Sequence, residues 1–160
     1  MYSLLKKAAF IAVFSLIYFL GIRELRGVIH DLHLGTILPA EYGELQEGFW
    51  FYAPSSVSFA FYEESEVIHK QWTYKISFGM FFLFGCLGLI ALESRNNSYL
   101  YLVGIHFIGG MLSFIGLLLA LTLSFKFLII PDLLSRYLVP LCSLGLVALS
   151  YIQKREALKE

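Results

Sequence analysis

The stretch FFLFGCLGLIALESRNNSYLYLVGIHFIGG, residues 81–110, decides the fold because two apolar runs meet there at one short polar turn. With their flanks, both runs come close to the roughly 20 apolar residues that a helix needs to cross a membrane. The polar residues 93–98 leave room only for a tight reversal between neighbouring antiparallel helices. The stretch therefore predicts a helical hairpin, with membrane spans over about 74–92 and 99–125.

The composition of the whole chain agrees with a membrane protein. Of its 160 residues, 58% are hydrophobic and 15% are charged, whereas about a quarter of an average soluble domain is charged. The 12 basic and 12 acidic side chains cancel, so nothing indicates a nucleic-acid partner. We expect a single membrane domain, residues 1–160, with the lipid bilayer as its surroundings.

Two further apolar runs complete the pattern. The first, about 4–22, contains the basic pair Lys6 and Lys7 near its start. Such a start is also typical of a signal peptide, but the run has no small-x-small cleavage site, so we predict a retained anchor helix. The last run, about 133–152, is apolar except for Arg136. The four runs predict an all-α integral membrane protein, a four-transmembrane-helix bundle.

Residues 23–73 form the predicted loop between the first two spans. Within it, 49–52 and 57–62 are predicted as a β-hairpin, because the second arm alternates in polarity after a turn that contains proline and serine. A lone two-stranded hairpin is marginal in water. We therefore expect its aromatic side chains to rest on the membrane interface, the bundle or a partner. These side chains include Trp50, Phe59 and Phe61.

The orientation depends on the charges that flank the spans. Four spans place both termini on one side, and six basic residues fall on each side of the membrane. The basic residues on the terminal side are concentrated in short segments, which favours the cytoplasm for both termini. Residues 23–73 would then form an extracytoplasmic loop.

Cys86 and His106 are the residues in the spans most able to carry chemistry. Both are expected roughly 10 Å deep on the hairpin helices, and such a pair can serve as nucleophile and base. No third group is visible to orient the histidine, so a histidine bonded to backbone or hydroxyl, beside an inert cysteine, is the simpler interpretation. His30, His33 and His69 could share a metal ion, but no metal-binding motif surrounds them. We expect no catalytic, metal or cofactor site.

Two other patterns indicate packing or partner contact. Asp132 and Arg136 stand four residues apart, so they can pair on one helix face, while the arginine could also reach the interface or a partner. Gly109, Ser113 and Gly116 belong to a small-residue stripe of the kind that lets helices approach closely. The stripe can serve the bundle itself, which we favour, or dock a larger membrane protein.

The pair Ile22 and Arg23 begins the loop, and RYLVPL at 136–141 leads to YIQK at 151–154. In these residues and in its layout the chain resembles a family of small exosortase-associated membrane proteins, found mainly in Bacteroidetes-type bacteria. Exosortases process carboxy-terminal sorting signals and resemble cysteine proteases with Cys, Arg and His near the outer membrane face. This chain does not reproduce that set. The resemblance implies a companion of the enzyme in the bacterial cytoplasmic (inner) membrane.

The leading hypothesis is therefore a non-enzymatic accessory subunit of a protein-sorting or surface-export system, with a larger polytopic, exosortase-like partner. The residues expected to contact that partner are Arg23, Trp50, Phe59, Phe61, Gly109, Ser113, Gly116, Asp132 and Arg136. Two alternatives stay open. One is a small redox- or metal-binding membrane protein that uses Cys86 and His106 or the loop histidines. The other is a small transporter or channel, which the few polar groups in the spans disfavour.

Overall fold

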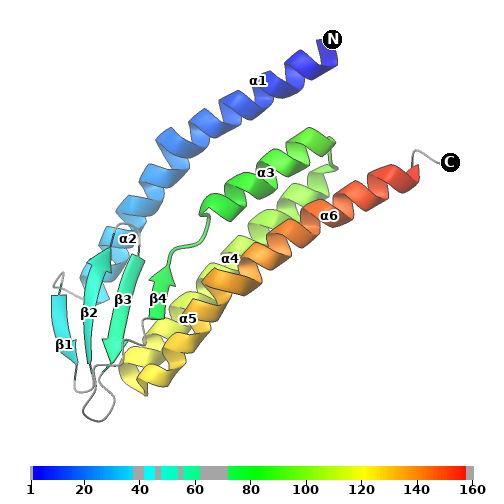
Figure 1. Cartoon of the computed structure of the whole chain (residues 1–160). Helices are drawn as coiled ribbons and strands as arrows, with labels where there is room; N and C mark the ends of the chain where they lie inside the picture. Colours follow the sequence, from blue (N-terminus) through cyan, green and yellow to red (C-terminus); the bar gives the residue numbers. More distant parts are fainter. Residues whose placement is uncertain (1, 38–41, 46–47, 54–55, 62–71, 158–160) are drawn as a thin grey trace.

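The computed structural model describes residues 2–37, 42–45, 48–53, 56–61 and 72–157. Both termini lie at one end of an elongated helical bundle, and a small sheet lies at the opposite end (Figure 1). In chain order the elements are α1 (Tyr2–Ile17), η1 (Tyr18–Ile22), α2 (Arg23–Ile37), β1 (Tyr42–Leu45), β2 (Gly48–Ala53), β3 (Ser56–Phe61), β4 (Trp72–Lys75), α3 (Met80–Leu92), α4 (Asn96–Thr122), η2 (Phe125–Leu128), α5 (Ile129–Leu133), η3 (Leu134–Leu138) and α6 (Val139–Ala157). We refer to the two ends as the terminal end and the sheet end.

Among the described residues, three helices are long and apolar enough to cross a membrane: Leu4–Ile29, Asn96–Thr122 and Lys126–Ala157. They indicate an integral membrane protein. The first extends beyond the predicted span because α1, η1 and α2 follow one another without a break, so residues 23–37, the start of the segment between the first two predicted spans, continue the helix. The last passes through Pro131, which is tolerated because it lies in the first turn of α5.

The predicted second span, 74–92, was wrong in its bounds. Its helix, α3, has only 13 residues, about 20 Å of length, whereas the hydrocarbon core of a bilayer is about 30 Å thick. Residues 74 and 75 belong to β4, and residues 76–79 connect that strand to the helix without helical structure of their own. The part of the chain that the structure describes therefore contains three long apolar helices and one short apolar helix.

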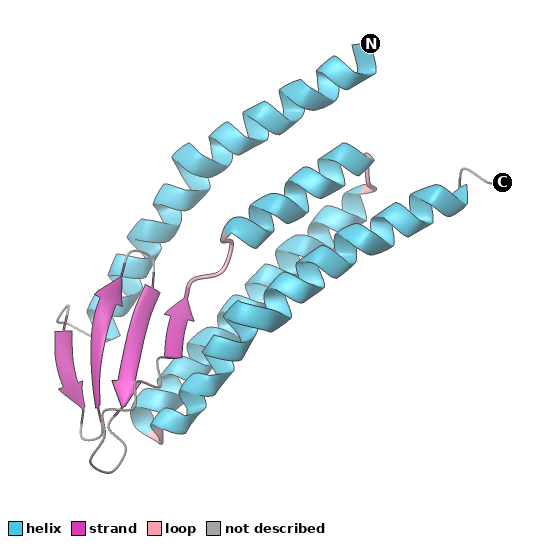
Figure 2. Ribbon diagram, viewed as in Figure 1, coloured by secondary structure: helices cyan, strands magenta, loops and turns pink. Residues whose placement is uncertain are grey.

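The sheet is built from four strands in the order β1-β2-β3-β4, each antiparallel to its neighbour (Figure 2). The predicted hairpin is confirmed as the central pair, with Trp50 opposite Phe59. Residues 54 and 55 of its predicted turn lie outside the described residues. The outer strands provide the extra pairing that a lone hairpin lacks, and β4 contacts α5, which attaches the sheet to the bundle.

α3 is the central helix of the bundle, because it contacts α1, α4 and α6. One core cluster joins these elements, and its buried members are Tyr18, Phe82, Leu83, Cys86, Leu89 and Leu102. By contrast, large apolar side chains on α1, such as Leu4, Phe10 and Leu16, are exposed. Such an apolar outer face is expected of a helix that lipid surrounds.

Candidate functional site

The connection between β4 and α3 is the irregular feature of the bundle. Phe78 has φ 63°, in the left-handed region, which is a costly conformation for a bulky residue unless its surroundings hold it. Gly79 then precedes the first turn of α3 and offers no side chain to cap it. The backbone groups of residues 76–78 therefore need hydrogen-bond partners from elsewhere in the chain.

Arg26 on α2 provides two of those bonds. Its Nε donates to the carbonyl of Ser77 at 2.8 Å, and its Nη2 donates to the carbonyl of Ile76 at 3.0 Å. Hydrogen bonds from a charged donor are shorter and stronger than neutral ones. The guanidinium therefore ties the first long helix to the chain that enters α3.

Tyr18 and His106 bind the two backbone groups of Phe78. The Tyr18 hydroxyl donates to the carbonyl of Phe78 at 3.2 Å, and the N–H of Phe78 donates to Nδ1 of His106 at 3.3 Å. The ring of Phe78 also lies 5.0 Å from that of Phe82 and 5.5 Å from that of His106, centroid to centroid. These contacts fix Phe78 in its left-handed conformation.

Ser143 on α6 completes the arrangement and defines the histidine tautomer. Its hydroxyl donates to the carbonyl of Val139 at 2.7 Å, so its oxygen accepts from Nε2 of His106 at 3.1 Å. His106 is thus a neutral imidazole with its proton on Nε2, and Nδ1 is free to accept from Phe78. We call the four side chains that hold residues 76–78, directly or through one another, the backbone lock: Tyr18, Arg26, His106 and Ser143.

The backbone lock holds structure and leaves little for chemistry. Both ring nitrogens of His106 are occupied, and its side chain is only 2% exposed. The prediction of a buried histidine bonded to backbone and hydroxyl is therefore confirmed. Cys86 is buried in the core cluster beside Phe82 and Leu83. Over the described ranges, no three His, Cys, Asp or Glu residues form a group that could hold a metal ion.

The loop histidines cannot be placed as a group. His30 and His33 lie on α2, and His69 lies outside the described residues. The hypothesis that they share a metal therefore stays a prediction.

The small-residue stripe packs inside the molecule. A Cβ atom on Gly109 would collide with the Val139 side chain, and one on Gly116 would lie 2.8 Å from Cδ of Pro131. Ser113 between them is buried as well. The favoured interpretation, packing within the bundle, is confirmed. Gly109 also lines an apolar pocket together with Val139. Contact between the three residues and an external partner stays a prediction.

Among the aromatic residues of the predicted hairpin, Phe59 is fully buried. It lies on β3, an inner strand of the sheet, and its side chain packs inside the molecule. Contact between Phe59 and a partner stays a prediction. Trp50 lies opposite it on β2, and Phe61 is the last residue of β3.

Of the charged residues in the predicted contact set, Arg23 and Arg136 are exposed, whereas Asp132 is buried. Arg136 Nε is 2.8 Å from Asp132 Oδ1, which confirms the predicted pairing, and 42% of the arginine side chain is exposed against 13% of the aspartate. Arg23 is exposed at the start of α2.

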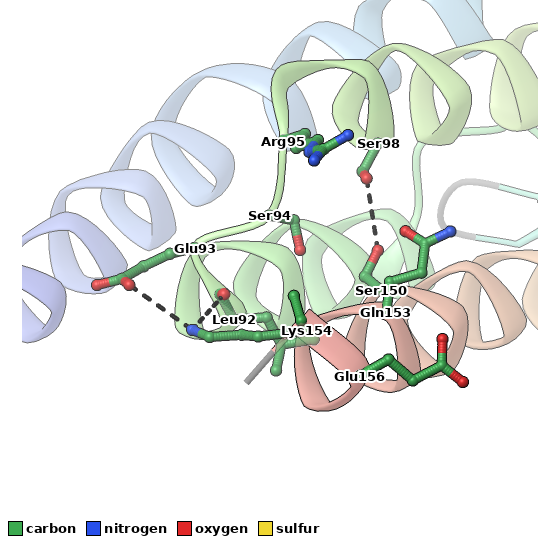
Figure 3. Close-up of a pocket in the computed structure, with 10 residues that line it drawn as sticks. Leu92, Glu93, Ser94, Arg95, Ser98, Ser150, Gln153, Lys154 and Glu156 are labelled. Carbon is green, nitrogen blue, oxygen red and sulfur yellow. Dashed lines mark hydrogen bonds and ion pairs between the residues drawn. The ribbon is translucent and has the colours of Figure 1, made fainter. Parts of the chain in front are cut away.

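A second polar cluster lies at the terminal end (Figure 3). Glu93 forms ion pairs with Lys7 at 3.0 Å and with Lys154 at 3.6 Å. Nζ of Lys154 also donates a hydrogen bond to the carbonyl of Leu92 at 2.7 Å. Hydrogen bonding and charge from Lys7 lower the pKa of the Glu93 carboxyl. Desolvation opposes part of this effect, and Lys154 adds a smaller lowering contribution. We call this trio the terminal clip.

Sequence reasoning did not anticipate either cluster. One signal was available: Arg26 follows an apolar span by a few residues on a stretch that can stay helical, and a charge near membrane depth is usually paired or functional. Its partners are backbone carbonyls about 50 residues away, and no residue pattern marks a carbonyl as an acceptor.

The fold and the backbone lock together define a helical integral membrane protein. Its helix α3 is short and follows a non-helical connection, and a four-stranded sheet lies at one end. Comparison with models of known protein families, with curated proteins and with solved structures finds no match. The function is therefore argued from the site.

Proposed function

We propose that the chain is a non-enzymatic accessory subunit of a bacterial exosortase-type membrane protein-sorting or surface-export system. The observation that carries the proposal is the backbone lock. Its polar side chains are committed to one another and to backbone groups near the sheet end. Groups so committed are suited to holding a structure in place, and the structure they hold leads directly into β4.

The sheet supports the same role. β4 joins α3 through residues 76–79 and contacts α5, so it is attached to the bundle on two sides. A sheet mounted in this way can present a fixed surface at one face of a membrane. In the proposed orientation both termini are cytoplasmic, and the sheet lies outside, where sorted proteins emerge. The partner would be a larger polytopic membrane protein.

Photo-crosslinking in native membranes tests the proposal. A photoreactive amino acid is placed at Lys75 on β4 or at Tyr137 on η3, both exposed near the sheet end, and at Phe107, which is exposed midway along α4, as the matched control. We expect the first two positions to capture one and the same polytopic membrane protein, which affinity purification of the tagged chain also recovers. Phe107 should capture lipid.

Two results would contradict the accessory role. The first is capture of no protein at Lys75 and Tyr137, together with purification of the chain alone from gently solubilised membranes. The second is stoichiometric metal or a haem absorption band in the purified protein, which would favour the redox or metal-binding alternative. Loss of surface sorting on deletion of the gene would support the accessory role further.

A further inference from the structure

A pocket opens between the first long helix and the start of α3. Its lining residues are Tyr18, Phe19, Arg23, Glu24, Arg26, Gly27 and Met80. The pocket is open on the side of α2, because a Cβ atom built on Gly27 would meet nothing within 4 Å. Phe19 and Met80 are exposed at its edge, so the pocket combines apolar walls with two arginines.

The charge of the pocket is not balanced. In the described part of the chain neither Arg23 nor Arg26 forms an ion pair, and only Glu24, itself exposed, carries a negative charge in the lining. Arg26 is partly buried, and its two carbonyl acceptors carry dipoles but no net charge. A partly buried cation without a counter-ion is costly, so the site favours an anion of one negative charge.

The depth of the pocket indicates where that anion comes from. Nineteen residues separate Lys7 from Arg26, about 28 Å of helix at 1.5 Å per residue, which matches the roughly 30 Å hydrocarbon thickness of a bilayer. If Lys7 lies at one headgroup layer, Arg23 and Arg26 lie at the other. The first residue of α3, Met80, also borders the pocket, and a helix N-terminus adds partial positive charge.

We propose that this pocket binds the phosphodiester headgroup of an anionic phospholipid. Arg23 would contact the phosphate, and the acyl chains would lie against Phe19 and Met80. Arg26 would add its positive charge while it stays bonded to its two carbonyls. The carboxylate of Glu24 repels additional negative charge in the pocket, so a headgroup with a single negative charge fits better than one with several. The lipid site is independent of the accessory role, because it needs no protein partner.

Native mass spectrometry of the detergent-purified full chain tests the lipid site. The probes are phosphatidylglycerol, which carries one negative charge, and phosphatidylcholine, which is zwitterionic. We expect retention of one phosphatidylglycerol in preference to phosphatidylcholine. Arg23→Gln should weaken that binding by about five- to tenfold, the loss of one charge-assisted contact. Gly27→Leu, which fills the pocket and leaves every charge in place, should weaken it as much.

The matched control is Lys126→Gln, which removes an exposed cation outside the pocket and should leave phosphatidylglycerol binding unchanged. Thermal unfolding in neutral detergent checks that all variants fold. Equal retention of both lipids, or equal losses in Arg23→Gln and Lys126→Gln, would overturn the proposal. Inorganic phosphate is the second arm: if it stabilises the wild type and displaces phosphatidylglycerol, the site takes a soluble anion and the lipid assignment is wrong.

Discussion

α3 and α4 are neighbouring apolar helices joined by one tight turn, yet their backbones are satisfied in different ways. α4 runs for 27 residues, and its backbone N–H and C=O groups are paired mainly within the helix itself. α3 has 13 residues, and the chain that leads into it takes its bonds from Arg26, Tyr18 and His106. Hydropathy measures composition, which the two helices share. The break between β4 and α3 depends on polar side chains that approach from other helices.

The difference has an energetic consequence. In surroundings that exclude water, an unsatisfied backbone group costs on the order of several kcal/mol. The entry into α3 should therefore be sensitive to single polar substitutions on distant elements, whereas α4 should be sensitive mainly to the size of the residues that pack on it. Three sets of substitutions test this contrast and one further substitution tests the turn that joins the two helices; they follow in order of expected effect.

Arg26→Met should have the largest effect. It leaves the carbonyls of Ile76 and Ser77 without their donors, at a cost of about 3 kcal/mol or more, because each bond comes from a charged group. Detergent-induced unfolding in mixed micelles measures the loss. Arg23→Met, one turn earlier and exposed, removes the same charge and should change stability by about 0.5 kcal/mol or less. Similar losses in the two variants would show that the Arg26 bonds do not hold the break.

His106→Leu should come second, at about 2 kcal/mol, because the partly buried N–H of Phe78 loses its acceptor. Ser143→Ala removes only the outer support of the imidazole and should cost about 1 kcal/mol. The double variant should be little worse than His106→Leu alone, since the serine acts through the histidine. Fully additive losses would mean that Ser143 and His106 contribute independently.

Much of this architecture followed from local patterns. The alternation of Val57, Phe59 and Phe61 predicted β3, and the four-residue spacing of Asp132 and Arg136 predicted their ion pair. Both features depend only on neighbouring residues. The spacing of the small residues on α4 is local as well, although the residues they meet lie on other helices.

The features that escaped prediction depend on distant residues. β4 covers Trp72–Lys75, and because its residues run directly into an apolar stretch they were assigned in part to the second span. Arg26 acts on carbonyls 50 and 51 residues away, and only the folded chain brings them together. Phe59 was expected to rest on the membrane interface, the bundle or a partner because a lone hairpin is marginal in water, whereas in the four-stranded sheet it is buried on an inner strand.

Gly109→Ala tests the other half of the contrast, namely that the stability of α4 depends on the size of the side chains at its helix contacts. The new methyl group would collide with Val139, at a cost of about 1–2 kcal/mol, since overpacking a close helix contact forces the neighbour to move. Gly104→Ala on the same helix meets nothing within 4 Å and should stabilise by about 0.5–1 kcal/mol through the higher helix propensity of alanine. Unfolding in mixed micelles should therefore give opposite signs. A gain at both positions would mean that α6 can move away at no cost.

Glu93→Gln should have the smallest effect, because Glu93 is exposed at the turn that joins the two helices. Its pKa lies below the ordinary value of 4.5, owing first to Lys7 and then to Lys154. A lowered pKa means that the ionised carboxylate stabilises the fold, fully above pH 4.5 and progressively less as the pH falls through the folded-state pKa. The variant should thus unfold at a slightly lower temperature than the wild type at neutral pH. The difference should disappear in acid and shrink in high salt, which screens exposed ion pairs. A difference that persists at low pH would mean that Glu93 acts through its backbone conformation, φ 54°, and that the terminal clip adds nothing to the turn between α3 and α4.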